Sequence, residues 1–239
     1  MKKFYLNTKV CIVGSGFCGF AAYKEMTNNN IPCLLIEGGE TKTPRNVQEQ
    51  KNYIVEMNKL VKNSSSFFKK EVRNGLSPSF GQRKFTLGGS SQCWGGLIKP
   101  FEKNLYTNSF KSMNDQSWGE LSLKDYDLKS LNLLNSPIFD FDPEILAKKL
   151  NSDLPDLPDK FYYSTYAMAE EPLRLKNLLI ENIAINPNEI NQKNNILCNY
   201  KLIDYNLNSK NINQLIFENK QNKLFVKSDF FIIAMGGIE

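Results

Sequence analysis

Hydrophobic positions in the first 40 residues predict two buried strands joined by a helix. Residues 10–13 (VCIV) are continuously apolar, which is typical of a strand covered on both faces of a sheet. Phe20, Tyr23 and Met26 then recur at helical spacing, and three asparagines at residues 28–30 end that helix. Residues 32–36 (PCLLI) supply a second buried strand. This order fits one right-handed crossover between parallel strands.

Shorter elements are predicted beyond residue 40. Apolar spacing within residues 44–61 indicates a surface helix, and two further helices are expected to start at Ser122 and at Asp142. Polar stretches separate three short strands at residues 196–205, 213–217 and 223–226, which we expect to form an antiparallel meander. A last buried strand is predicted at residues 230–235.

A glycine-rich turn, GSGFCG at residues 14–19, follows the first strand directly. In such a turn Gly14 permits the tight bend, Gly16 lets a pyrophosphate approach the backbone, and Gly19 lets the helix pack closely on the strand. The helix N-terminus adds unpaired N–H groups and partial positive charge. Glu37 closes the second strand, where its carboxylate can accept hydrogen bonds from both hydroxyls of an adenosine ribose. The motif predicts a dinucleotide but does not separate FAD from NAD.

A second glycine-rich stretch, LGGSSQCWGG at residues 87–96, helps to separate the two cofactors. Gly88 and Gly89 would let the main chain lie against the flavin side of a cofactor, while Ser90 and Ser91 offer hydroxyls and N–H groups. Trp94, among four glycines, is expected to pack on another group. An ordinary polar surface loop is the alternative interpretation.

With this loop, the chain resembles the glucose–methanol–choline (GMC) family of FAD-dependent oxidoreductases. Residues 117–122 (SWGELS) and 231–239 (FIIAMGGIE) resemble two further segments of that family, in the same order. The resemblance implies that the flavin takes a hydride from a carbinol carbon while a histidine removes the hydroxyl proton.

The loop is most similar to the pyranose-oxidase branch of the family, in which a histidine links covalently to the flavin. Cys93 stands in the place of that histidine. A thiol could form a flavin thioether in principle, but a free, partly buried cysteine is the expected state.

The resemblance implies a Rossmann-like α/β fold with an inserted mixed region and a meander. We expect an FAD-binding part at residues 1–100, a partial substrate region of loops and short helices at 101–195, and the meander with a return strand at 196–239. No catalytic residue and no metal ligand are expected in the chain. The residues expected to contact FAD are Gly14, Ser15, Gly16, Phe17, Gly19, Glu37, Gly38, Gly88, Gly89, Ser90, Ser91, Cys93, Trp94, Gly95, Ala234 and Gly236.

The amino-acid composition excludes several kinds of site and partner. The chain has no histidine, so it lacks the commonest general base and metal ligand. Its five cysteines include no Cys-x-x-Cys pair, which favours reduced thiols over disulfides or a zinc site. The net charge of +5 is too dispersed to indicate a nucleic-acid surface. No apolar stretch approaches the roughly 20 residues of a membrane span, and no signal peptide follows Met1, so a cytoplasmic protein is expected.

These observations predict half of an enzyme. In the GMC family a helix and the substrate-binding sheet follow the strand that ends at Gly236, so we expect the catalytic half to lie beyond residue 239. The complete protein would take a small alcohol or sugar as substrate. Two alternatives stay open: an NAD-dependent dehydrogenase, which residues 14–37 alone would allow, and a non-catalytic nucleotide-binding fragment or subunit whose partner chain supplies the rest.

Overall fold

The structure is a computed structural model that describes residues 1–41, 86–99, 123–134, 136, 141–158, 161–169 and 171–235. The chain divides into two compact units. The larger unit comprises Met1–Cys93 and Arg174–Glu239, and the smaller unit comprises Trp94–Leu173. The helix predicted at residues 44–61 and the motif at 117–122 lie outside the described residues. The sequence-based division at residues 100 and 195 stays a prediction.

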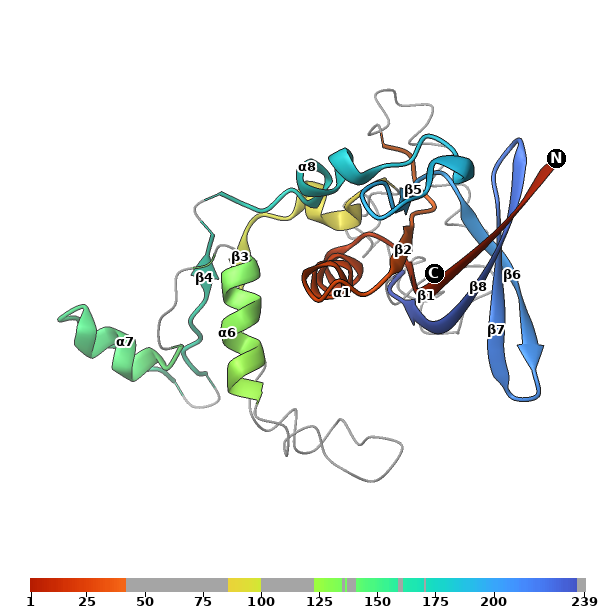
Figure 1. Cartoon of the computed structure of the whole chain (residues 1–239). Helices are drawn as coiled ribbons and strands as arrows, with labels where there is room; N and C mark the ends of the chain where they lie inside the picture. The colour runs from red at the N-terminus through yellow and green to blue at the C-terminus, as the bar shows by residue number, and fades with distance from the viewer. Residues whose placement is uncertain are drawn as a thin grey trace, which may run out of the picture. The chain divides into compact units, whose positions relative to one another are not determined.

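A six-stranded mixed sheet forms the larger unit (Figure 1). Its strand order is β5-β2-β1-β8-β7-β6. The first four strands in that order are parallel neighbours, and β7 and β6 run antiparallel. The strands are β1 (Lys2–Val13), β2 (Cys33–Ile36), β5 (Ile196–Leu197), β6 (Lys201–Asn208), β7 (Asn211–Glu218) and β8 (Asn222–Ile233).

The first three elements are those that the sequence predicts. Helix α1 (Phe17–Asn28) joins β1 to β2, and the two strands pair in parallel from Val10↔Cys33 to Val13↔Ile36. Phe20 and Tyr23 on α1 are buried, as helical spacing indicated. The predicted strand, helix and strand are therefore confirmed.

Two strands are longer than predicted. β1 begins at Lys2 instead of Val10, and β8 is one continuous strand where two short ones were expected. The two strands pair in parallel along their whole length, from Lys2↔Asn222 to Val13↔Ile233. The polar first half of β1 is held by pairing and by contacts on both faces. On one side Tyr5 stacks on Phe225 with ring centroids 4.9 Å apart.

The predicted meander is confirmed, with one change in its strands. β6, β7 and β8 are successive antiparallel neighbours, and the tight turn between β6 and β7 places Ser209 at φ 58°. The first expected strand is divided into β5 and β6. Asn199 between them has φ 63°, and its N–H donates to the carbonyl of Gly39, so the chain turns there instead of extending.

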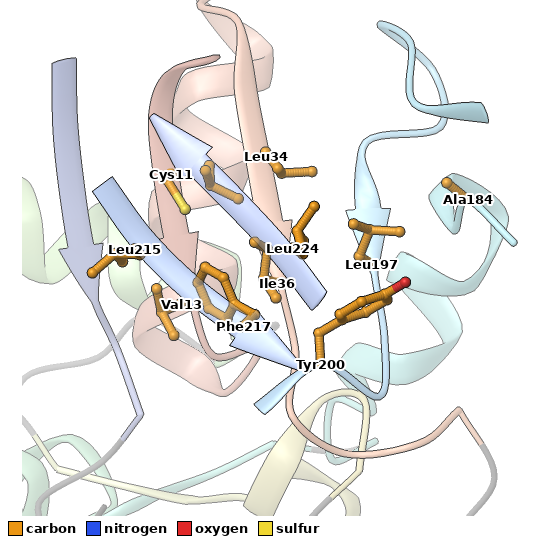
Figure 2. Packing of buried hydrophobic residues seen from close by; sticks show 11 residues of the cluster. Cys11, Val13, Leu34, Ile36, Ala184, Leu197, Tyr200, Leu215, Phe217 and Leu224 are labelled. Carbon is orange, nitrogen blue, oxygen red and sulfur yellow. The ribbon is translucent and has the colours of Figure 1, made fainter. Parts of the chain in front are cut away.

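One hydrophobic core serves both the parallel strands and the meander (Figure 2). Five strands contribute side chains to it, so neither half of the sheet has a separate core. Its buried members are Cys11, Val13, Leu34, Ile36, Ala184, Leu197, Tyr200, Leu215, Phe217, Leu224 and Val226.

The smaller unit holds short elements. Strands β3 (Leu97–Ile98) and β4 (Ala167–Met168) pair antiparallel, and the described residues include helices α6 (Leu123–Leu133) and α7 (Pro143–Lys149). The predicted start of α7 is confirmed, because Asp142 Oδ1 accepts hydrogen bonds from the N–H groups of Glu144 (2.9 Å) and Ile145 (3.2 Å).

The other helical segments among the described residues belong to the larger unit. They are α8 (Leu175–Leu179) and the 3-10 turns η1 (Gly89–Cys93), η3 (Ile180–Asn182) and η4 (Pro187–Glu189). Within the described ranges, no helix has the length and apolar character needed to cross a membrane.

Candidate cofactor site

The turn between β1 and α1 requires glycine at two positions. Gly14 has φ +97°, and a Cβ there would lie 2.6 Å from the carbonyl oxygen of Ala234, beyond the end of β8. A Cβ at Gly19 would lie only 1.9 Å from the carbonyl oxygen of Gly14. Both positions therefore serve the close approach of the turn to the helix and to the neighbouring strand.

Gly16 differs from these two glycines. A Cβ built on Gly16 would have no atom of the chain within 4 Å. Gly16 is also the N-cap of α1, and no side chain caps the helix there. At the start of α1 there is thus room for a group the size of a side chain, and a helix N-terminus favours an anionic one.

Glu37 is buried at the carboxyl end of β2, and both of its carboxylate oxygens accept hydrogen bonds from the chain. Oε2 accepts from the Ser15 N–H (2.9 Å) and from the Ser15 hydroxyl (2.5 Å), while Oε1 accepts from the Gly39 N–H (2.7 Å). A carboxylate offers about four acceptor positions, so about one remains for a ligand. The sequence suggested two ribose hydroxyls at this carboxylate, and the contacts with Ser15 and Gly39 were not foreseen. Gly38 lies between these groups and is half-buried.

The loop at residues 88–93 lies against the turn at residues 14–19. The N–H of Gly88 donates to the Ser15 hydroxyl (2.8 Å), and a Cβ on Gly89 would lie 3.5 Å from the Cα of Gly16. Gly88 and Gly89 have φ values of +83° and +52°, which favour glycine. The two glycine-rich segments that the sequence singled out are thus brought together at Gly16.

The two serines of the loop have different surroundings. Ser91 is buried, and its hydroxyl accepts a hydrogen bond from the N–H of Leu175 at the start of α8 (3.2 Å). Ser90 is exposed. Ser91 therefore holds the loop on the fold, and Ser90 faces outward.

Arg174 is a contact that sequence reasoning missed. Its guanidinium donates to the carbonyl oxygen of Ser91 (2.8 Å), which fixes the loop to the residue that precedes α8. A single arginine in a segment without a recognisable motif gave no signal in the sequence.

The other expected site residues are spread over several places. Phe17 opens α1 and Cys93 ends η1. Trp94 and Gly95 belong to the smaller unit, where the Trp94 indole N–H donates to the carbonyl of Leu97 (3.2 Å). Gly236 lies outside the described residues.

The thiol of Cys198, which the charge of Glu37 reaches, is a poor nucleophile. Burial raises the pKa of Cys198 to about 12, and the negative charge of Glu37 adds to the effect. Burial likewise raises the pKa of Cys11 to about 12. Both thiols are therefore protonated at neutral pH and are poor nucleophiles.

A second buried polar cluster lies at the other end of β2. The Tyr23 hydroxyl of α1 donates to Asn195 Oδ1 (2.7 Å), and the Asn195 amide lies 3.9 Å from the sulfur of Cys33. Burial, with a smaller contribution from Cys33, raises the pKa of Tyr23 to about 12, although the hydrogen bond to Asn195 opposes the shift. This cluster joins α1 to the sheet.

No family model matches the chain, and no curated protein matches it. Among solved structures, pyridoxine 4-oxidase from Mesorbium loti matches 96% of the chain at 14% identity, with a TM-score of 0.54. The Mycobacterium smegmatis Sdh1 complex in the apo form matches 100% at 12% identity, with a TM-score of 0.43, and the chain covers 35% of it. An adenosine-5-phosphosulfate reductase in complex with sulfite matches 99% at 13% identity, with a TM-score of 0.41, and the chain covers 31% of it.

Only the first of these scores is high enough to show a shared fold. The fold is similar to that of pyridoxine 4-oxidase. The chain spans 50% of the length of that protein.

The site offers more for binding than for acid–base chemistry. It combines a buried carboxylate, a helix start without a side-chain cap and open space at Gly16. Among the residues that the structure describes, no cluster of side chains could hold a metal ion. The arrangement suits a ligand with a polar sugar at one end and a diphosphate beside it.

Proposed function

We propose that this chain binds FAD and forms the cofactor-binding half of a GMC-type oxidoreductase that acts on CH–OH groups. The observation that carries the proposal is the close approach of Gly89 to Gly16, where a Cβ on Gly89 would lie 3.5 Å from the Gly16 Cα. It joins the second glycine-rich loop to the open position of the first turn. A ligand that uses both segments must extend beyond its pyrophosphate along the loop, as FAD does.

The residues present fit an FAD molecule. The ADP part would lie between Gly16 and Glu37, with its pyrophosphate at the start of α1, in the Rossmann-like manner. The flavin part would follow the loop at residues 88–93, where Ser90 is exposed. The fold shared with pyridoxine 4-oxidase supports the same hypothesis of FAD binding. Trp94, Gly95 and Gly236 stay part of the proposed site by resemblance alone.

In the proposed enzyme the cofactor and the catalytic base have different sources. Bound FAD would supply a hydride acceptor for an alcohol or sugar. This chain would bind and orient the cofactor, while its 239 residues contain no histidine to remove the hydroxyl proton. The base would come from the rest of the protein or from a partner chain. We therefore expect little or no alcohol oxidation by these residues alone.

An absorption spectrum of the purified protein tests the cofactor. We expect flavin bands in the spectrum, or their appearance on adding FAD with a rise in melting temperature, and no such rise with NAD. Flavin fluorescence after acid precipitation controls for covalent attachment through Cys93, because a non-covalent flavin stays in the supernatant. A colourless protein that is stabilised by NAD and indifferent to FAD would favour the dehydrogenase alternative and refute the proposal.

A further inference from the structure

The Ser15 hydroxyl joins three segments that are distant in the sequence. It donates to Glu37 Oε2 at the end of β2 (2.5 Å) and accepts from the N–H of Gly88 in the second loop (2.8 Å). Ser15 itself lies in the β1–α1 turn and has 0% exposure. One buried hydroxyl thus uses its only hydrogen to bind the carboxylate and a lone pair to bind the loop.

We propose that Ser15 is a positioning residue that fixes the Glu37 carboxylate and the loop at residues 88–93 relative to each other before any ligand binds. The proposal deepens the proposed function and rests on it for the identity of the ligand. Ser15 acts on the ligand through Glu37 and Gly88.

Burial makes this hydroxyl hard to replace. Without it, the Gly88 N–H would be buried with no acceptor from Ser15, and Glu37 Oε2 would lose one of its two donors. An unpaired buried N–H and an under-solvated carboxylate are both unfavourable, so the loop and the carboxylate would shift to find other partners. Such a shift would reach Gly39, whose N–H binds the other carboxylate oxygen.

The site therefore has a built-in link between its two ends. Glu37 is proposed for the sugar end of the ligand, and the loop for the flavin end. Because one hydroxyl holds both, a ligand meets a site that is already assembled, and less ordering is needed on binding.

Amide hydrogen exchange of the free protein tests the link without any ligand. In Ser15→Ala we expect the protection of the Gly88 and Gly39 amides to fall by at least about tenfold. Gly39 is the decisive position, since its N–H is bound by the Glu37 carboxylate and not by Ser15, so loss of the Ser15 hydroxyl reaches it through the carboxylate. Ser228→Ala is the control for loss of a serine hydroxyl elsewhere in the sheet, because the single hydrogen of Ser228 is shared between the main-chain carbonyls of Lys9 and Phe230. Unchanged protection of Gly39 in Ser15→Ala would overturn the proposal.

ADP affinity tests the same link in binding. We expect Ser15→Ala to weaken ADP binding about tenfold, and Glu37→Gln to weaken it much less in the Ser15→Ala background than in the wild type. Additive effects of the two substitutions would show that Ser15 does not act through Glu37 and would overturn the proposal. If the wild type binds neither ADP nor FAD, the proposed function fails, whereas the exchange of Gly39 still decides whether Ser15 positions Glu37.

Discussion

Two buried polar clusters lie at opposite ends of β2, and they differ in what surrounds them. At the carboxyl end, Ser15 and the Gly39 N–H bind Glu37. At the other end, Tyr23 binds Asn195 beside Cys33. Both clusters satisfy their polar groups within the chain, as buried groups generally must. Burial and hydrogen bonding alone therefore do not distinguish a binding site from a structural joint.

The difference is the space beside each cluster. The Glu37 cluster adjoins the turn of Gly16, where a side chain would meet nothing within 4 Å, and an uncapped helix start. The Tyr23 cluster lies between α1 and the sheet, and burial raises the pKa of its hydroxyl to about 12. One polar cluster has a place for a ligand and the other is closed. Substitutions in either cluster should therefore have different effects on binding and on stability.

Filling the open space at Gly16 with a side chain should have the largest effect on cofactor binding. In Gly16→Val the side chain would occupy the space proposed for the pyrophosphate, so FAD and ADP binding should fall below detection. The backbone of Gly16 has φ −66°, which any residue tolerates, so the fold should survive. Loss of a favourable N-cap should cost only about 1 kcal/mol of stability. Isothermal titration and thermal unfolding separate the two quantities, and unchanged FAD affinity would show that Gly16 does not border the site.

Adding a side chain at Gly19 should destabilise the fold and not act on binding directly. Gly19→Ala would place a Cβ 1.9 Å from the carbonyl oxygen of Gly14, and this backbone oxygen cannot move aside as the end of a flexible side chain could. We expect the free energy of unfolding to fall by about 3 kcal/mol, as in overpacked cores. Urea unfolding measures the loss. A stability equal to wild type would mean that the turn and α1 are farther apart than described.

Neutralising the carboxylate should weaken the ligand moderately. Glu37→Gln keeps the shape but removes a charged acceptor, so ADP affinity should fall by about 1–3 kcal/mol. Equilibrium dialysis with ADP gives the affinity, and FAD should follow the same trend. Equal affinities for the variant and the wild type would remove Glu37 from the site.

Changing the closed cluster should have the smallest effect. Tyr23→Phe removes one buried hydrogen bond, so we expect a loss of about 1 kcal/mol in stability and no change in cofactor affinity. The pKa of Tyr23 rises from 10.0 to about 12 in the fold, so its stabilising contribution is complete below pH 10 and is lost as the pH rises through 12. Between pH 8 and pH 12 the free energy of unfolding should therefore fall more steeply in the wild type than in Tyr23→Phe. A cofactor affinity lowered by the Phe variant would contradict the comparison.

The sequence predicted best where one local pattern determines the structure. Apolar runs and helical spacing located β2 and α1, and a proline after Asp142 located the start of α7. The first half of β1 escaped prediction because Asn7, Thr8 and Lys9 interrupt its apolar pattern, and its stability comes from pairing with β8. Propensity within one strand cannot reveal a distant partner.

Prediction of the candidate site was limited in the same way, to features that are local in the sequence. The glycines and Glu37 were recognisable because their motif is local. The bridge from Ser15 to Gly88 and the anchoring of Ser91 by Arg174 join residues far apart in the chain. These contacts depend on how the second loop folds back, and residue spacing carries no information about that path.

The pairing of β1 with β8 also has a consequence for synthesis. The Ser228 hydroxyl binds the carbonyl of Lys9, 219 positions earlier in the chain. A ribosome adds about 5–20 residues per second, so the nascent β1 would wait about 10–40 s for its partner. During that interval β2 can pair with one edge of β1, while the other edge, with Tyr5 beside it, stays open to any extended chain nearby. The hydrogen-bonding edge of β1 that will receive β8 is therefore open to mispairing until residues 222–233 have been made.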